Sequence, residues 1–382
     1  MDGLATQAPP ASPAPPGPPA HDEAALGPRG STPPATVRSP SGPVTALRNG
    51  LKRAARRWES ARAGLEARDF TSWAPELDAA LKVLPESPNC PGALLQLLCE
   101  PRPDTPKRIV LLTEHGTPVA VVALRLTPWG WEPVTTWTIP GLPFPVRSGQ
   151  TARALRAVGL PMKVAWWRCP EPMPKGPAIA FVKETATRQI ELGADFEQYW
   201  RSMGRLKDIK QARKRCNQFQ LAVDPEGGAG WTIRNAGVKW RIPGDIAEDQ
   251  VAAAEWLETR SRHHTLLLCD GDRPLAGMSC HVDGGDLVGH TTFRDPNANW
   301  FCAGVFLMDR LTVWAAQHGF ARLDLGGGFD YKARWAPESG KNFTLQVTPL
   351  YSRIAAGLRG VRRPSAAVAT PEGPPAESTP ED

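Results

Sequence analysis

The chain has 382 residues, of which 41% are hydrophobic and 22% charged, and its formal net charge of +6 is too small to identify a partner. No apolar run approaches the roughly 20 residues that span a bilayer, and the start, MDGLATQAPP, has no charged and apolar leader. We therefore expect neither a secreted nor a membrane-spanning protein. The seven cysteines are widely spaced without a CxxC pair, which indicates reduced thiols and a cytoplasmic location.

Both ends of the chain have the composition of disordered tails. Residues 1–43 are dominated by Pro, Ala, Gly and Ser, and residues 353–382 begin basic and then take the same bias. Such segments bury too little apolar surface to offset the entropy lost on ordering. The roughly 300–320 residues between them suffice for two compact domains or two halves of a pseudo-repeat.

The first ordered element expected is a basic amphipathic helix over 44–68. Arginines and lysines lie off an apolar stripe, and the stripe consists of Val44, Leu47, Leu51, Ala54, Trp58, Ala61 and Leu65. One interpretation is that the helix packs on its own domain through the stripe. The other is that it attaches the protein to an anionic membrane surface or to a partner helix.

Residues 69–190 form the predicted N-terminal half, in which helical and strand patterns alternate. A hairpin is expected over 108–128, with its turn at His115-Gly116. The other expected elements are helices at 75–84 and 151–159, a strand that runs into a Pro/Gly loop over 134–146, and a strand at 162–169. This interleaving predicts an α/β or α+β class rather than an all-helical protein.

Residues 191–352 form the predicted C-terminal half. Asp195 with Gln198, and Asp245 with Glu248, have the spacing of capping boxes that open two helices. Between those helices the pattern at 232–237 predicts a strand. The remaining expected elements are three strands over 264–295 with two glycine turns, a helix at 305–319 and a strand at 320–326.

The three glycines at 326–328 follow the last of these strands and raise the question of a phosphate-binding loop. No Gly-Lys-Ser/Thr follows them, and Tyr331 stands where a dinucleotide fingerprint needs its last glycine. A phosphate needs the free N–H groups of a helix N-terminus. The better cofactor-binding candidate is therefore the loop-to-helix junction Cys302-Ala303-Gly304-Val305-Phe306.

The unit over 286–337 resembles the GNAT acyltransferase fold, in which a phosphate site lies between a strand and the following helix. More narrowly, it resembles the CelD/BcsL-like acetyltransferases, which are related to the FemAB transferases. The matching positions are Asp295-Pro296, Gly304, Asp324, Gly326, Tyr331-Lys332 and Trp335. The resemblance implies tandem GNAT-like halves, each a mixed, mostly antiparallel sheet flanked by helices. It also implies acetyl-CoA or another acyl-CoA as co-substrate, without a metal.

Acyl transfer needs a proton acceptor and donors for the developing oxyanion. We predict that Lys332 stabilises negative charge, that Tyr331 acts as acid or base, and that Asp330 or His290 serves as base. The structural alternative is that Tyr331 and Trp335 anchor the core and Lys332 is a satisfied surface cation. Cys302, which precedes a helix N-terminus, is weighed as a nucleophile.

Two further clusters were weighed as binding sites. Lys207, Lys210, Arg213 and Lys214 gather on one helix, and they are either a solvated face or a site for an anionic acceptor or for nucleotide phosphates. A group of histidines and cysteines could in principle hold zinc, but no subset has metal-ligand spacing, so no metal is predicted. Its members are His263, His264, Cys269, Cys280, His281 and His290.

These observations predict an acyl-CoA-dependent N- or O-acyltransferase, acting by direct transfer on a sugar, an envelope precursor or a small metabolite. One alternative is a FemAB-like transferase that uses aminoacyl-tRNA. Another is a non-catalytic scaffold with a GNAT fold, recruited to a membrane by 44–68. No DNA partner is expected.

Overall fold

The computed structural model describes residues 43–350 and 352, apart from 88, 137, 194, 328 and 329. The predicted tails lie outside the described residues, save for Pro43. The helices are α1 (Pro43–Arg62), α2 (Pro75–Leu81), α3 (Gly92–Leu98), α4 (Thr151–Ala157), α5 (Phe196–Ser202), α6 (Leu206–Arg215), α7 (Gly228–Trp240), α8 (Gly244–Glu258) and α9 (Ala303–Gln317).

The strands join into one sheet of 12 strands, in the order β1-β2-β3-β4-β5-β12-β6-β11-β10-β9-β8-β7. They are β1 (Glu66–Phe70), β2 (Lys107–Glu114), β3 (Thr117–Thr127), β4 (Gly130–Pro133), β5 (Met162–Trp166), β6 (Ile179–Glu191), β7 (Gln220–Val223), β8 (His263–Asp270), β9 (Arg273–Asp283), β10 (Asp286–Arg294), β11 (Arg322–Gly327) and β12 (Glu338–Val347). Among these strands, β4 with β5 and β10 with β11 are parallel, and the other neighbours are antiparallel.

The sheet consists of two halves that repeat one order of elements. In the first, the antiparallel strands β2, β3 and β4 lead through α4 to the parallel strand β5. In the second, β8, β9 and β10 lead through α9 to β11 in the same way. The predicted α/β class, with two mixed and mostly antiparallel halves flanked by helices, is confirmed.

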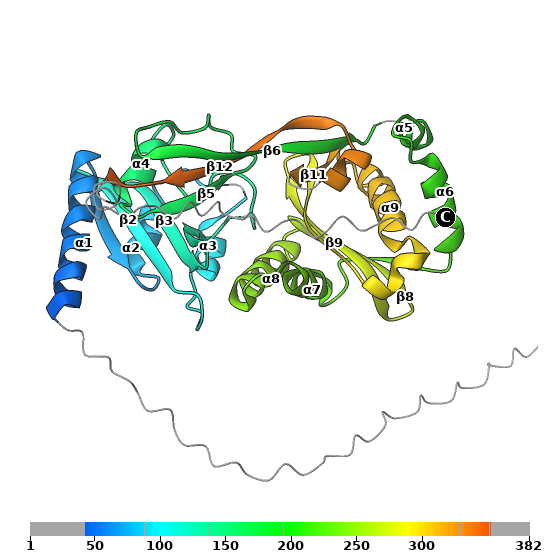
Figure 1. Cartoon of the computed structure of the whole chain (residues 1–382), viewed down its shortest axis with the longest axis horizontal. Coiled ribbons are helices and arrows are strands. Elements are labelled where there is room, and N and C mark those ends of the chain that lie inside the picture. Colours follow the sequence, from blue (N-terminus) through cyan, green and yellow to red (C-terminus); the bar gives the residue numbers. More distant parts are fainter. Residues whose placement is uncertain are drawn as a thin grey trace, which may run out of the picture. The chain divides into compact units, whose positions relative to one another are not determined.

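The halves exchange their last strands. β6 follows β5 along the chain but pairs with β11, whereas β12 follows β11 and pairs with β5. β6 and β12 also pair with each other, from Glu338 opposite Arg188 to Val347 opposite Ile179. They run side by side between the two halves (Figure 1), so the sheet is continuous.

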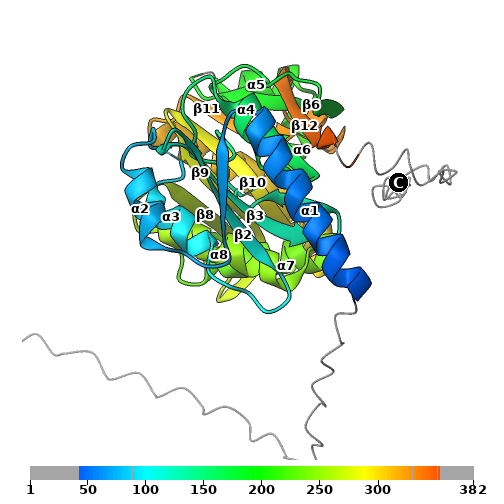
Figure 2. The same cartoon turned by 90° about the vertical axis from the view of Figure 1, so that its left-hand side faces the viewer.

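The N-terminal half buries both faces of its sheet. Alternate residues of β2 and β3 point to opposite sides, which fits strands covered on both faces. Val110, Leu112, Val122 and Leu124 pack with Leu155 of α4 on one side. On the other side, Ile109, Leu111, Val121 and Ala123 pack with α2 and α3, and also with Ala253 and Leu257 of α8. The contact between α3 and α8, adjacent in Figure 2, joins the two halves.

The C-terminal half is built around α9. Leu307, Leu311 and Ala315 of this helix are buried against β8–β11. Asp195 caps α5 by accepting from the backbone N–H groups of Glu197 and Gln198, which confirms it as the N-cap of this helix.

Three local predictions were wrong. Residues 232–237 belong to helix α7, because Ala229 and Ile233 recur at helical spacing and pack against α8. Residues 134–146 form turns and isolated bridges, and the strand of that region is β4. Pro243, rather than Asp245, is the N-cap of α8, with no side-chain hydrogen bond.

The basic helix is shorter than predicted and packs through another side. α1 ends at Arg62, since Gly64 takes a φ of +65° and β1 begins at Glu66. Of the predicted stripe, Ala54, Ala61 and Trp58, which is 48% exposed, face solvent, whereas Leu65 is buried beyond the helix.

The side of α1 that packs is polar. Glu59 and Ser60 are buried, and Ser60 Oγ donates to the carbonyl oxygen of Ala157 at 2.8 Å. The prediction that α1 packs through the stripe is therefore wrong for Ala54, Trp58 and Ala61. Contact of the stripe with a membrane or a partner stays a prediction. None of the described helices is long and apolar enough to cross a bilayer.

Candidate functional site

The candidate site begins where the parallel strands β10 and β11 part. Their ladder consists of three residue pairs and ends with Val288 opposite Asp324, although β10 continues to Arg294. β10 carries a bulge between Gly289 and Thr291, at the point where the pairing ends. Bulges bend a strand and redirect its side chains, so β10 turns away from β11 here.

The start of α9 follows this parting of the strands. Cys302 is the N-cap in a left-handed conformation, with φ of 61°, and its carbonyl oxygen accepts from the N–H groups of Val305 and Phe306. Helix geometry leaves the earlier amides, of Ala303 and Gly304, without acceptors inside the helix. The predicted cofactor-binding junction is thus a helix N-terminus whose positive end can bind an anion.

Two arginines lie beside this junction. Arg215 Nη1 of α6 lies 3.9 Å from Cys302 Sγ, and a Cβ added to Gly304 would lie 3.5 Å from Arg294 Cδ. The side chains of both arginines thus reach the start of α9, where the helix N-terminus carries positive partial charge.

Gly326 and Gly327 shape the end of β11, where the register of this strand with β6 shifts. Gly326 has a φ of +68°, and its N–H donates to Asp324 Oδ1 at 2.7 Å. A Cβ added to Gly327 would lie 2.9 Å from Thr185 of β6, so a side chain there would press the strands apart. These two glycines therefore serve a tight turn and a close strand contact.

Lys332 lies in the 3₁₀ helix Asp330–Arg334 and reaches back over this turn. Its Nζ donates to the carbonyl oxygens of Leu325 at 2.5 Å and of Gly327 at 3.0 Å. Burial lowers the pKa of Lys332 to about 8, although the nearby carboxylate of Asp324 opposes that shift. The ammonium group of Lys332 therefore loses its proton more readily than that of an exposed lysine.

The neighbours of Lys332 differ in their surroundings. Tyr331 is 43% exposed, which argues against a core anchor, whereas Trp335 is buried and packs edge-on against Trp200 at 5.9 Å. Tyr199 donates its hydroxyl hydrogen to the carbonyl oxygen of Trp335. The side chain of Asp330 lies outside the described part of the structure.

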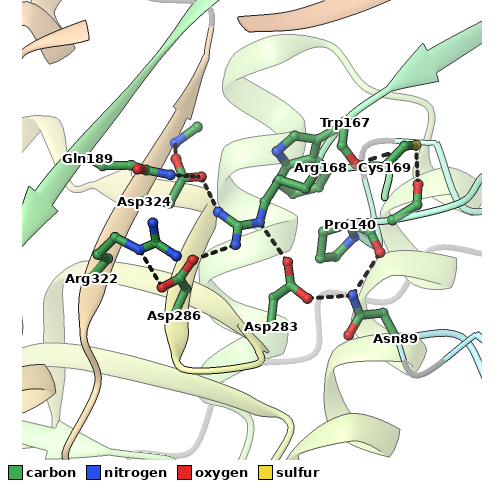
Figure 3. Close-up of polar contacts among 12 residues, drawn as sticks. Asn89, Pro140, Trp167, Arg168, Cys169, Gln189, Asp283, Asp286, Arg322 and Asp324 are labelled. Atoms are coloured by element: carbon green, nitrogen blue, oxygen red, sulfur yellow. Dashed lines mark hydrogen bonds and ion pairs between the residues drawn. The ribbon is translucent and has the colours of Figure 1, made fainter. Parts of the chain in front are cut away.

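One arginine from the N-terminal half connects to three aspartates of the C-terminal half (Figure 3). Arg168 donates from Nε to Asp283 at 2.6 Å, from Nη1 to Asp324 at 2.7 Å and from Nη2 to Asp286 at 2.5 Å. Burial alone would lower the pKa of Arg168, but the hydrogen bonds to the carboxylates raise it. Arg168 also has a φ of 53°, which a residue with a Cβ adopts only when its contacts stabilise it.

Further polar groups complete this cluster. Arg322 donates to Asp286 at 2.8 Å, Gln189 to Asp324 at 3.2 Å, and Asn89 to Asp283 at 2.9 Å. Asp324 thereby links the arginine cluster to the turn over which Lys332 lies. The orientation of the two halves is coupled to the geometry of the candidate site.

The other predicted site residues have different surroundings. Arg213 forms a two-bonded ion pair with the buried Asp309 of α9, with both distances 2.8 Å, so it fastens α6 to α9. Lys207, Lys210 and Lys214 are exposed on α6. His290 has both ring nitrogens in hydrogen bonds, to Thr291 and His263, and lies in a group of three histidines.

Sequence reasoning assigned no role to Arg168, Arg215 or Arg294. Arg168 lies in a strand-like run, and nothing in the sequence indicates its left-handed backbone. The signal available for Arg294 was its position next to Asp295-Pro296, just before the junction.

Comparison with known proteins bears on this geometry. Residues 204–333 are similar to the acetyltransferase (GNAT) domain. This stretch contains the strand pair β10–β11, α9 and Lys332. The narrower likeness to CelD/BcsL-like enzymes stays a prediction. A search of curated proteins finds no match.

Several solved structures are similar at low identity. They include L-PGS from Bacillus licheniformis (13% identity, 75% of this chain and 94% of that one, TM-score 0.46), FemX (12%, 76% and 99%, 0.43) and a tandem GNAT protein from the clavulanic acid biosynthesis pathway (10%, 75% and 99%, 0.40).

Proposed function

We propose that the protein is an acyl-CoA-dependent acyltransferase that transfers its acyl group directly to an amine or hydroxyl. The GNAT-domain match over 204–333 supports acyl transfer as the general chemistry. The observation that carries the proposal is the anion site at the start of α9, next to parting parallel strands. The amides of Ala303 and Gly304, with Arg215 and Arg294, would hold the pyrophosphate of the donor.

In the proposed reaction, the acceptor's nitrogen or oxygen attacks the thioester carbonyl. A C–N or C–O bond forms, the C–S bond breaks, and the acceptor's proton passes to the departing thiolate. Lys332 would donate a hydrogen bond to the negative oxygen that develops on the carbonyl. Tyr331, exposed next to it, is the candidate for moving the proton.

The acceptor is proposed to be a sugar, an envelope precursor or a small metabolite. The exposed lysines of α6 favour an anionic acceptor. They equally favour one alternative, an aminoacyl-tRNA donor in place of acyl-CoA. Retention of tRNA that weakens steeply with salt, without binding of CoA, would support that alternative.

Isothermal titration of the full chain with CoA and acetyl-CoA tests the proposal. Saturable binding with one site per chain is expected for both ligands. Lys239→Gln, which removes an exposed positive charge from α7, should bind both ligands as the wild type does. If neither ligand gives heat, in protein with an intact circular dichroism spectrum, the proposed use of acyl-CoA is refuted.

A further inference from the structure

Three histidines from adjacent strands meet in the C-terminal half. His263 of β8 and His281 of β9 are directly opposite each other in the antiparallel ladder. His290 belongs to the bulge of β10, and its ring stacks on that of His281 with centroids 4.4 Å apart. One ring nitrogen of each histidine lies within 4.8 Å of the other two.

Each ring is held on its outer side by a different group. Glu258 of α8 accepts from His263 Nδ1 at 3.1 Å, and the same carboxylate oxygen accepts from Thr265 at 2.7 Å. His290 Nδ1 lies 2.8 Å from the hydroxyl of Thr291. The backbone of Thr138 lies beside the ring of His281 and opposes the lowering of its pKa. Outer partners of this kind fix the orientation of metal-binding histidines.

The ring nitrogens that face one another cannot all form hydrogen bonds within the cluster, because too few of them carry a hydrogen atom. His263 Nε2 lies 3.0 Å from His290 Nε2, so one of the two donates. Because Glu258 takes the hydrogen of His263 Nδ1, the neutral His263 ring turns a lone pair inward. His281 Nε2 is buried and has no hydrogen-bond partner in the described part of the chain, and it too carries a lone pair.

We propose that His263, His281 and His290 bind a divalent transition-metal ion of the zinc type through their Nε2 atoms. Zn–N bonds of about 2.0–2.1 Å place tetrahedral ligand nitrogens about 3.3 Å apart, close to the 3.0 Å between His263 and His290. The ion would satisfy the buried His281 Nε2. His290 would move its proton to Nδ1 and donate to Thr291.

The surroundings suit this assignment. Burial lowers the pKa of all three imidazoles, so they are neutral, which is the form that binds metal. His290 is partly exposed, whereas His263 and His281 are buried, so a water molecule can take the fourth position from the side of His290. The site would tie β8, β9 and β10 together, and it is independent of the proposed acyl transfer.

Cobalt titration of the untagged, metal-stripped full chain tests the proposal. We expect one equivalent of Co²⁺ with the intense visible absorption of a tetrahedral site, displaced by Zn²⁺. His281→Leu should weaken Co²⁺ binding by about 100-fold or more, and Glu258→Gln by about 10- to 100-fold with unchanged stoichiometry. His264→Leu is the matched control, because His264 bonds to Asp224 instead of joining the three rings.

Absence of cobalt absorption in the wild-type chain would overturn the proposal, and so would equal binding by His281→Leu. Thermal unfolding separates a metal site from a plain hydrogen-bonded cluster. Zinc should raise the melting temperature of the wild type and of His264→Leu but not of His281→Leu. A His281→Leu variant as stable as the zinc-loaded wild type would contradict the metal site, because loss of a ligand should remove the stability that bound zinc adds.

Discussion

Replacing Arg168 with alanine should destabilise the protein far more than the loss of a surface ion pair. Asp324 and Asp286 have side chains only 1% and 3% exposed, whereas Asp283 is 24% exposed. After the change, Asp286 keeps Arg322 and Asp283 regains water. Asp324 keeps Gln189 and a backbone N–H, but it loses its direct ion-pair partner.

Only one of the three aspartates is therefore left as a buried charge without its partner. The free energy of unfolding should fall by about 3–5 kcal/mol, the cost of one such charge, rather than by three times that value. Arg168→Gly should lose about 1 kcal/mol less than Arg168→Ala, because glycine accepts a positive φ. Chemical denaturation monitored by circular dichroism measures both.

Two comparisons make this prediction specific. Arg234→Ala removes an exposed arginine paired with Glu248, and should cost no more than about 1 kcal/mol. Adding Asp324→Asn to Arg168→Ala removes the unpaired carboxylate and should restore most of the lost stability. If Arg168→Ala costs less than about 1 kcal/mol, or if Asp324→Asn gives no recovery, the reasoning about Asp324 is refuted.

Three further predictions concern the candidate site. Since the pKa of Lys332 is about 8, turnover should fall as pH rises through that value. Lys332→Arg should move this fall in turnover to higher pH. Lys332→Met should lower kcat by about 100-fold or more. A pH profile of the wild type that stays flat to pH 10 would contradict this role. Arg215→Gln and Arg294→Gln should each raise the Kd for CoA by roughly 5- to 10-fold, and by less at high salt. Lys239→Gln should leave this Kd unchanged. If titration gives the arginine variants the affinity of the wild type, Arg215 and Arg294 do not belong to the site. Gly327→Ala, whose Cβ would lie 2.9 Å from a methyl carbon of β6, should cost about 1–3 kcal/mol of stability in denaturant, and an unchanged midpoint would contradict the close contact.

The sequence predicts local elements well where periodicity and turn residues agree. The three strands after residue 262 and helix α9 have clear alternation, helical spacing and glycine turns, and the structure has them as expected. The strand predicted at 232–237 was wrong because six residues are too few to separate a helical period from a strand. The exchange of β6 and β12 depends on pairing between distant segments, which no local pattern encodes.

The candidate site could be predicted in part. The helix start at Gly304 and the position of Lys332 after β11 follow from local patterns. The three histidines do not, because residues 263, 281 and 290 meet only through strand register and a bulge in β10. Arg168 likewise depends on contacts between halves that are far apart in the sequence.

Transfer of a labelled acyl group tests the central claim most directly. Cell extract fractions would be supplied with isotopically labelled acetyl-CoA and the wild-type chain, and products would be identified by mass spectrometry. The account predicts a labelled amide or ester that forms with the wild type, together with released CoA, and that is nearly absent with Lys332→Met. A folded wild-type protein that yields no labelled product in any fraction, or a Lys332→Met variant as active as the wild type, would contradict it.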